Sequence, residues 1–301
     1  MRRVSTVDLM LLATVLLWSF NFTVTKYALT HGFRPLAFST IRYGAAATLF
    51  AGITYNRERT LRVRRRDLGI AAAAAAVGIY LNQVTYVYAI KFTTATTVAL
   101  ILGTTPIFTA LLAWVVRLER LSTRFWIAAA VSFLGVAFVA LGSGGGVSGD
   151  VKGDLLSVGT AITWAAYSVA ITPLMRRYSP WRISAVVLLI GWVPLAATGA
   201  HQVLTQDFSA IGPLVWAGLV YALIGPLVLT NILWFTAIDR VGPSRATLFA
   251  NVQPFFAAIF ALLILSESMT RLQVVGGLAI GAGIVLARTR ARPGTPPPTE
   301  A

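Results

Sequence analysis

The chain has 301 residues, of which 57% are hydrophobic and only 12% are charged, and its mean hydropathy is +0.76. Such a chain has too little polar surface to cover a soluble globule, so its composition indicates an integral membrane protein. The formal net charge of +15 comes from Lys and Arg residues spread over short connections, which is typical of membrane topology and excludes a nucleic-acid-binding face. With no cysteine, disulfides and thiolate metal sites are excluded, and the sequence predicts no metal and no cofactor.

Apolar runs long enough to cross roughly 30 Å of hydrocarbon follow one another along the chain. The first run, residues 7–29, has no small-residue cleavage site after a short apolar core, so we interpret it as a retained helix rather than a signal peptide. The sequence therefore predicts an all-α membrane protein with ten transmembrane helices. The other nine are expected over 36–55, 68–90, 94–117, 124–142, 154–175, 182–200, 212–238, 243–265 and 271–288.

The distribution of basic residues predicts the orientation of these helices. If the N-terminus is cytoplasmic, 19 of the 25 Lys and Arg residues fall in cytoplasmic connections or termini, five fall on the opposite side, and Arg42 lies inside the second helix. We therefore expect a multi-pass protein of a bacterial-type inner membrane with both termini cytoplasmic. The proline-rich tail, residues 291–301, is expected to be disordered.

The two halves of the chain are related by a repeat. A Gly- and Ser-rich connection over 142–150 separates a first repeat, residues 1–145, from a second, residues 150–290. An offset of 148 residues relates Pro106 to Pro254, Tyr86 to Trp234 and Glu119 to Glu267. Because each half holds five helices, an odd number, the second half enters the membrane from the other side. The halves are thus predicted to be inverted repeats around a central cavity, an arrangement characteristic of secondary transporters.

Two helix breaks stand at matched places in the repeats. Pro106 and Pro254 interrupt the apolar runs over 94–117 and 243–265, near the expected bilayer midplane. Each proline removes a backbone donor, which leaves the carbonyl of Leu102 or Ala250 without its usual partner. Because lipid cannot satisfy such a group, we expect neighbouring helices, polar side chains or a wet cavity to do so.

Several motifs stand in a fixed order along the chain, and the tryptophan and acid motifs occur in both halves. Trp18 and Trp164 stand early in their halves, Ile41-Arg42-Tyr43 lies in the second helix, and Glu119 and Glu267 follow the proline-containing helices. In this set of motifs the chain resembles the EamA-type ten-helix exporters of the drug/metabolite transporter superfamily, although Leu118 and Ser266 stand where that family usually has glycine before the acid. The resemblance implies alternating access around a central path and export of amino acids, related metabolites or drugs.

Polar and aromatic residues inside the predicted helices are the candidates for substrate binding, because each costs free energy in lipid and tends to point into the protein. Their aromatic rings and amides suit a small amphipathic molecule with an amine and a carboxylate. The alternative is that they serve as interfacial belts or as hydrogen bonds between helices. The candidates are Trp18, Asn21, Arg42, Tyr80, Gln83, Tyr86, Thr104, Thr105, Trp164, Tyr167, Asn231, Trp234, Asn251 and Gln253, with Pro106 and Pro254 as helix breaks.

Arg42 has two interpretations. It could bind a substrate carboxylate through two parallel hydrogen bonds, or it could satisfy backbone carbonyls at a helix break. No acid or histidine lies deep in a predicted helix, so we expect transport without a buried proton site, with Glu267 paired to Arg271 near a helix end.

Other functions and other assemblies were weighed against a monomeric transporter. A membrane-embedded enzyme would need a nucleophile with a base, an acid pair or metal ligands at one depth, and the sequence lacks them. A channel or a non-transporting receptor is a further alternative. Small residues on 124–142 and 271–288 favour packing of these two helices within a monomer, and a homodimer seam along the last helix is the alternative.

Overall fold

The structure is a computed structural model that describes residues 6–116, 122–142, 150–175, 177–230, 233–234, 236–237 and 252–288, and every regular element in them is helical. Seven helical stretches are long and apolar enough to cross a membrane, judged by length and composition. Three shorter apolar helices cover Pro213–Leu229, Gln253–Leu265 and Arg271–Leu286. The continuous helices are α1 (Thr6–Thr30), α2 (Pro35–Glu58), α7 (Thr123–Gly142), α8 (Asp150–Met175), α9 (Pro180–Leu204), α13 (Gln253–Leu265) and α14 (Arg271–Arg288).

Three of the predicted helices are interrupted rather than continuous. The helix expected over 68–90 consists of α3 (Arg65–Ala75), the π-helix η1 (Ala76–Leu81) and α4 (Asn82–Phe92). The helix expected over 212–238 begins as α10 (Pro213–Leu223) and continues as the π-helix η2 (Ile224–Leu229). The helix expected over 94–117 is divided into α5 (Ala95–Leu102) and α6 (Thr105–Val115). The sequence does not reveal the two π-helices, because residues 70–79 and 214–229 are almost entirely apolar and have no periodicity in which a widened turn could show.

The break between α5 and α6 is satisfied by the hydroxyl groups of its own threonines. Pro106 is the second residue of α6, where its missing N–H is least costly. Thr105 Oγ1 donates to the Leu102 carbonyl at 2.6 Å, and Thr104 Oγ1 donates to the Ile101 carbonyl at 2.6 Å. The carbonyl that the sequence predicts to be freed by Pro106 therefore has a side-chain partner. The matching carbonyl of Ala250 lies outside the described residues.

The positions of the interruptions recur along the chain with the offset of the sequence repeat. The two π-helices cover 76–81 and 224–229, which are 148 residues apart. The helices that start one residue before a proline begin at 105 and 253, and α7 and α14 begin at 123 and 271, again 148 residues apart. The first segment, residues 6–142, and the second segment, residues 150–288, thus share their backbone breaks as well as their motifs.

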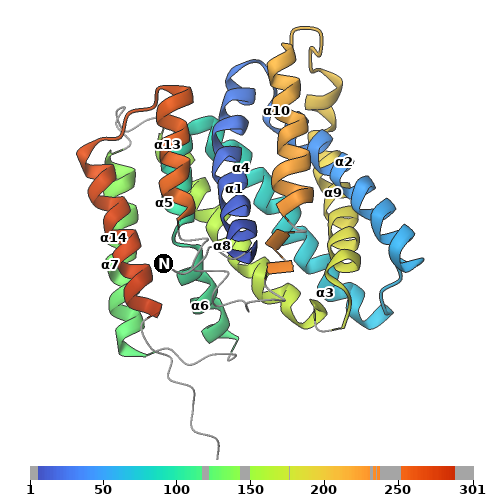
Figure 1. Ribbon diagram of the computed structural model, residues 1–301, viewed down its shortest axis with the longest axis horizontal. Helices are drawn as coiled ribbons and strands as arrows, with labels where there is room; N and C mark the ends of the chain where they lie inside the picture. Colours follow the sequence, from blue (N-terminus) through green and yellow to red (C-terminus); the bar gives the residue numbers. More distant parts are fainter. Residues whose placement is uncertain are drawn as a thin grey trace, which may run out of the picture.

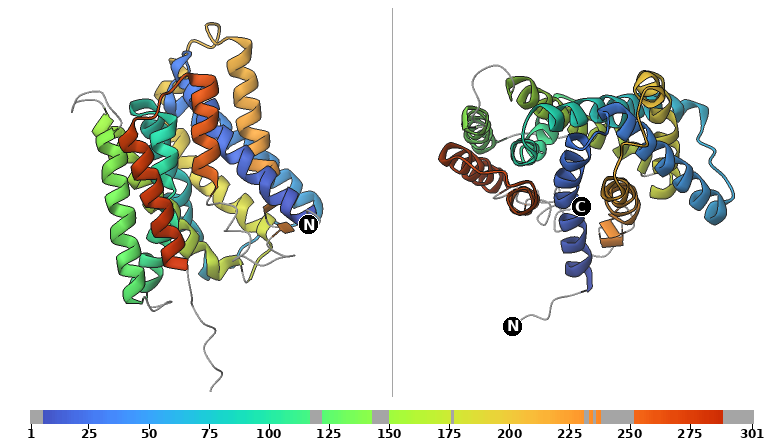
Figure 2. Two further views of the ribbon diagram at one scale, coloured as in Figure 1. Left: turned by 60° about the vertical axis from the view of Figure 1, so that its left-hand side comes forward. Right: turned by 90° about the horizontal axis from the view of Figure 1, so that it is seen from above.

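Helices α7 and α14 pack side by side at one flank of the molecule, and α2 and α9 lie together at the opposite flank, with α1 between them (Figure 1 and Figure 2). The α7–α14 contact is close because it is made by glycines: a Cβ added to Gly135 would lie 2.7 Å from the Gly276 carbonyl oxygen. The predicted pairing of these two helices is confirmed. Gly281, by contrast, has nothing within 4 Å of an added Cβ.

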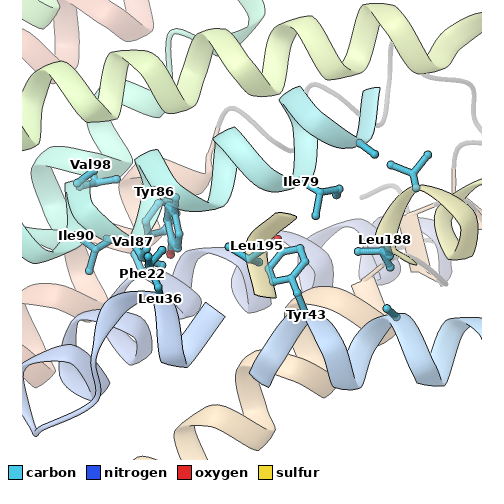
Figure 3. Close-up of a cluster of buried hydrophobic side chains, with 14 of the residues drawn as sticks. Phe22, Leu36, Tyr43, Ile79, Tyr86, Val87, Ile90, Val98, Leu188 and Leu195 are labelled. Atoms are coloured by element: carbon cyan, nitrogen blue, oxygen red, sulfur yellow. The ribbon is translucent and has the colours of Figure 1, made fainter. Parts of the chain in front are cut away.

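The largest hydrophobic cluster joins α1, α2, α4 and α9 in the middle of the molecule (Figure 3). Phe22, Val87 and Leu195 are among its buried members, as are the rings of Tyr43 and Tyr86. Since apolar side chains fill this region, the polar groups beside it are removed from bulk water. The cluster therefore forms one wall of the cavity described below.

The corner between α4 and α5 is held by two charged side chains. Lys26 Nζ donates to the carbonyls of Ile90 (2.8 Å) and Thr93 (2.7 Å), at the C-terminal end of α4. The Glu267 carboxylate accepts from the backbone N–H groups of Ala95 (2.9 Å) and Thr96 (3.0 Å), the first two residues of α5. Both charges suit the helix ends that they contact. The expected pairing of Glu267 with Arg271 is wrong, because the carboxylate lies on this helix N-terminus.

Candidate functional site

A cavity of about 670 Å³ lies in the middle of the helices, lined from both segments of the chain. Its walls come from α1, α2, α4, α5, α6 and α8 and from η2 and α13, so the α5–α6 break and η2 border the same space. The lining residues are Trp18, Asn21, Phe22, Arg42, Tyr43, Asn82, Gln83, Tyr86, Ala99, Leu102, Gly103, Thr105, Pro106, Thr109, Ala110, Thr160, Trp164, Ser168, Pro226, Leu227, Trp234, Gln253 and Pro254.

Most of the residues singled out from the sequence are brought together here. The lining includes Trp18, Asn21, Arg42, Gln83, Tyr86, Thr105, Trp164, Trp234 and Gln253, together with the helix breaks Pro106 and Pro254. Residues from separate helical elements of both segments thus line one cavity. Whether they contact a substrate remains a prediction.

Five of the candidates are not among the lining. Tyr80 packs against the central hydrophobic cluster, and Thr104 is fully buried with its hydroxyl on the Ile101 carbonyl. The ring of Tyr167 lies against Gly78, although it also contacts Trp164 with ring centroids 5.4 Å apart. Asn231 and Asn251 lie outside the described residues.

The lining also contains polar residues that sequence reasoning left aside, notably Asn82. On an ideal helix Asn82 is rotated by about 100° from Gln83, whereas Tyr80 and Gln83 share a face. The π-helix η1 ends at Leu81 and changes this phase, so Tyr80 is partly buried against the central hydrophobic cluster while both amides border the cavity. The signal that could have found Asn82 is its cost as an amide within an apolar run.

Arg42 borders the cavity and also donates a hydrogen bond to a backbone carbonyl at the junction of α10 and η2. Its side chain is buried, with a residue exposure of 3%, and its Nε donates to the Ala222 carbonyl at 3.0 Å. Four residues after Ala222 stands Pro226, which has no N–H to offer that carbonyl. The guanidinium also lies 5.5 Å from the centroid of the Tyr43 ring. Arg42 therefore has the structural role that its sequence position suggested, and its side chain still borders the cavity.

A chain of hydrogen bonds fixes how the amides are oriented. Asn82 Nδ2 donates to the Thr160 carbonyl at 3.0 Å, which can only accept, so Asn82 Oδ1 is free to receive Gln83 Nε2 at 3.3 Å. This leaves Gln83 Oε1 buried without a partner. Asn21 donates through Nδ2 to the Tyr86 hydroxyl at 3.1 Å, and its Oδ1 is likewise buried without a partner. Two carbonyl oxygens beside the cavity thus retain unused hydrogen-bonding capacity, at a cost of about 1–3 kcal/mol each.

The aromatic side chains of the lining form one pair across the two segments. The ring centroids of Trp18 and Trp234 are 5.1 Å apart at an interplanar angle of 52°. Trp18 Nε1 donates to Thr230 Oγ1 at 3.0 Å, which holds the first segment against the end of η2. In the described part of the lining Arg42 is the sole charged residue, and no carboxylate lies beside it. The cavity thus combines one cation, four amides and several aromatic rings.

The sequence model of the EamA-like transporter family matches residues 5–141 and again residues 151–289. The chain belongs to the EamA-like transporter family. A probable terminal-alkyne amino-acid exporter of Streptantibioticus cattleyicolor is 26% identical over 93% of this chain and 92% of its own. An uncharacterized transporter of Archaeoglobus fulgidus is 24% identical over 92% of this chain and 97% of its own.

A solved crystal structure, 18% identical in sequence, has the same fold as this EamA-family chain. It superposes with a TM-score of 0.66 and covers 94% of this chain and 96% of its own. Since the similar proteins are named transporters, a transporter rather than an enzyme is supported by the family. The resemblance drawn from Trp18, Arg42 and the two acid-bearing motifs is thereby confirmed.

Proposed function

We propose that this protein is a secondary transporter that moves small amphipathic metabolites, amino acids among them, across a bacterial-type inner membrane by alternating access, as an exporter or a facilitator. The observation that carries the proposal is the central cavity, in which a buried arginine without a lining carboxylate lies among amides and aromatic rings. A volume of about 670 Å³ is within the range of small-molecule sites.

The proposed architecture is ten helices in two inverted repeats of five, with both termini cytoplasmic. Its support is the offset of 148 residues between the π-helices and between the proline-led helices, together with the two separate matches of the family model. With an odd number of helices per repeat, matched breaks approach the midplane from opposite sides and border one site. Substrate binding at a repeat interface is what this architecture favours.

The chemistry of the lining indicates which residues would contact the carboxylate, the ammonium group and the apolar part of a substrate. A buried cation without a neighbouring acid favours an anionic partner, and a guanidinium binds a carboxylate through two parallel hydrogen bonds. The unpartnered oxygens of Asn21 and Gln83 could accept from an ammonium group after a small side-chain movement. The Trp18 and Trp234 rings would cover the apolar part of the molecule. An amino acid with an apolar side chain fits all three features.

Alternating access requires that one end of the cavity be closed while the other is open. In this structure the α4–α5 corner is held by Lys26 and Glu267, and Gly153 of α8 packs so closely on Thr93 that an added Cβ would lie 2.7 Å from its backbone nitrogen. We propose that this corner separates from α1 and α13 when the cavity opens on that side. Since no carboxylate or histidine lines the described cavity, exchange or facilitated movement is proposed rather than proton coupling.

A ligand screen by thermal unfolding tests the proposed substrate class. A ligand at 100 times its dissociation constant stabilises the purified protein by about 2.7 kcal/mol. Apolar amino acids are expected to raise the unfolding temperature, and their decarboxylated amines are expected to do so much less. Arg42→Lys should keep the fold and lose the amino-acid response, because an ammonium cannot form the paired contact. Equal stabilisation of the two proteins by an amino acid would contradict the carboxylate role of Arg42.

A further inference from the structure

A second cavity, of about 540 Å³, lies far along the helices from the first, where α2 passes to α3 and α8 passes to α9. It is lined by Arg62, Val63, Arg64, Arg177, Tyr178 and Arg182. Four arginines around one hollow, with no acid in the lining, form a concentrated positive site. Such a site is distinct from the diffuse excess of basic residues that membrane topology requires.

Only two of the four arginines are neutralised. Arg177 Nη1 lies 2.5 Å from Asp67 Oδ1, and Arg182 Nη2 lies 2.6 Å from Glu58 Oε2. Arg62 and Arg64 form no ion pair with any described residue, and both are exposed. The cavity therefore has two positive charges available for an anion.

Hydrogen bonds join the α2–α3 connection, which carries Arg62 and Arg64, to the α8–α9 connection, which carries Arg177 and Tyr178. The Arg64 backbone N–H donates to the Tyr178 hydroxyl at 3.0 Å, and that hydroxyl donates to Asp67 Oδ2 at 2.7 Å. Asp67 itself is buried, with a side-chain exposure of 1%. Because these hydrogen bonds already order both connections, an anion that binds here would pay a smaller entropic cost for ordering the chain.

The depth of the cavity along the helices matches that of lipid headgroups. Four candidate spans begin or end beside this cavity, and each has 24 to 28 residues, whereas about 20 suffice for the hydrocarbon core. They are Pro35–Glu58, Arg65–Phe92, Val151–Met175 and Pro180–Leu204. Their ends therefore extend to headgroup level. Trp181, with the Arg57 guanidinium 5.1 Å from its ring centroid, and the exposed Tyr55 are aromatic residues typical of that level.

We propose that this four-arginine cavity binds the phosphate group of an anionic phospholipid, with Arg62 and Arg64 supplying the unneutralised charge. Planar guanidinium groups match phosphate oxygens in paired hydrogen bonds, and basic pockets between membrane helices suit anionic headgroups. A bound headgroup would contact both the α2–α3 and the α8–α9 connections. It would thus link the first segment of the chain to the second.

The test compares the purified, full-length protein in nanodiscs of neutral phosphatidylcholine with nanodiscs that also contain phosphatidylglycerol. Phosphatidylglycerol should raise the unfolding temperature of the unmodified protein. R62Q/R64Q should unfold like the unmodified protein in phosphatidylcholine but require about tenfold more phosphatidylglycerol for the same rise, because its unpaired guanidinium groups are gone. The matched control R65Q/R66Q removes two charges from the first turn of α3, directly after this connection and outside the cavity lining, and should require less than half of that increase.

Three outcomes would overturn the proposal. An equal loss of response in R62Q/R64Q and R65Q/R66Q would mean that the arginines act only through the general surface charge. A rise of the same size on adding inorganic phosphate to phosphatidylcholine nanodiscs would assign the cavity to a free anion instead of a lipid. A full response in R62Q/R64Q would exclude the site altogether.

Discussion

The two segments of the chain share their backbone interruptions and differ in what surrounds them. Both place a π-helix and a proline-led helix at positions 148 residues apart. The first segment brings Arg42 and three of the four amides of the described lining, whereas the second brings one amide, Gln253. Aromatic residues line the cavity from both segments, so the two copies differ mainly in the charge and the amides that they contribute.

The two π-helices also differ in their residues and in the side chains that contact them. The third residue of η1 is Gly78, where an added Cβ would lie 2.1 Å from Cδ2 of Tyr167. In η2 the corresponding residue is Pro226, and the Ala222 carbonyl is met by Arg42 from the first segment. The residue 148 positions after Arg42 is Ile190, which has no hydrogen-bond donor in its side chain. One arginine thus suffices, because only one of the two π-helices contains a proline.

The largest effect is expected from Arg42→Leu, which removes the charge of the cavity and the donor of the Ala222 carbonyl. The free energy of unfolding should fall by about 1–3 kcal/mol, the cost of leaving a buried carbonyl unpaired. Substrate transport should fall to background. Denaturant unfolding and proteoliposome flux measure the two effects.

Pro226→Ala in the Arg42→Leu background separates these roles. This second substitution supplies a backbone N–H four residues after Ala222 that can restore the missing bond, so stability should recover while transport does not. Recovery of both would show that Arg42 acts only on the helix break, and the substrate role would have to be abandoned.

Gly78→Ala tests whether η1 depends on close packing in the way that η2 depends on Arg42. The Cβ would meet the Tyr167 ring, so we expect a loss of about 1–3 kcal/mol from overpacking. Gly281→Ala is the matched control, because an added Cβ there has nothing within 4 Å. Equal thermal unfolding of the two variants would mean that the Gly78 contact has no bearing on stability.

Much of the fold follows from the sequence, because long apolar runs, basic connections and matched prolines are visible in it. The site was predictable as far as the periodicity of an ordinary α-helix holds, as for Trp18 and Asn21 on α1. The prediction of the lining residues was wrong at Tyr80 and Asn82, because a π-helix rotates the residues that follow it. That rotation cannot be recognised in a run of residues that is almost entirely apolar. The predicted partner of Glu267 was also wrong, because its actual partners in α5 are distant in the sequence.

Glu267→Ala is expected to have a smaller effect than the changes beside the π-helices. It removes the carboxylate from the N-terminus of α5 and should cost about 1 kcal/mol, as loss of a helix cap does. Glu267→Gln keeps one acceptor and should fall between the two proteins in thermal unfolding. If Glu267→Gln is less stable than Glu267→Ala, the carboxylate does not act as a cap.

The smallest effect on stability is expected from Gln253→Thr, which gives the second segment the residue that the first has at Thr105. Both positions line the cavity, so the change should alter the relative uptake of different amino acids with little change in unfolding temperature. Competition between labelled substrates in proteoliposomes measures the profile. An unchanged profile would place substrate choice with Trp18, Trp164 and Trp234 instead.

Counterflow in proteoliposomes tests most directly whether the central cavity carries amino acids by their carboxylates. Vesicles loaded with an unlabelled apolar amino acid should accumulate the labelled amino acid transiently, and vesicles loaded with its decarboxylated amine should not. Arg42→Lys, reconstituted to the same density, should abolish the accumulation. Counterflow driven equally by the amine, or unchanged in Arg42→Lys, would contradict the proposed role of the cavity.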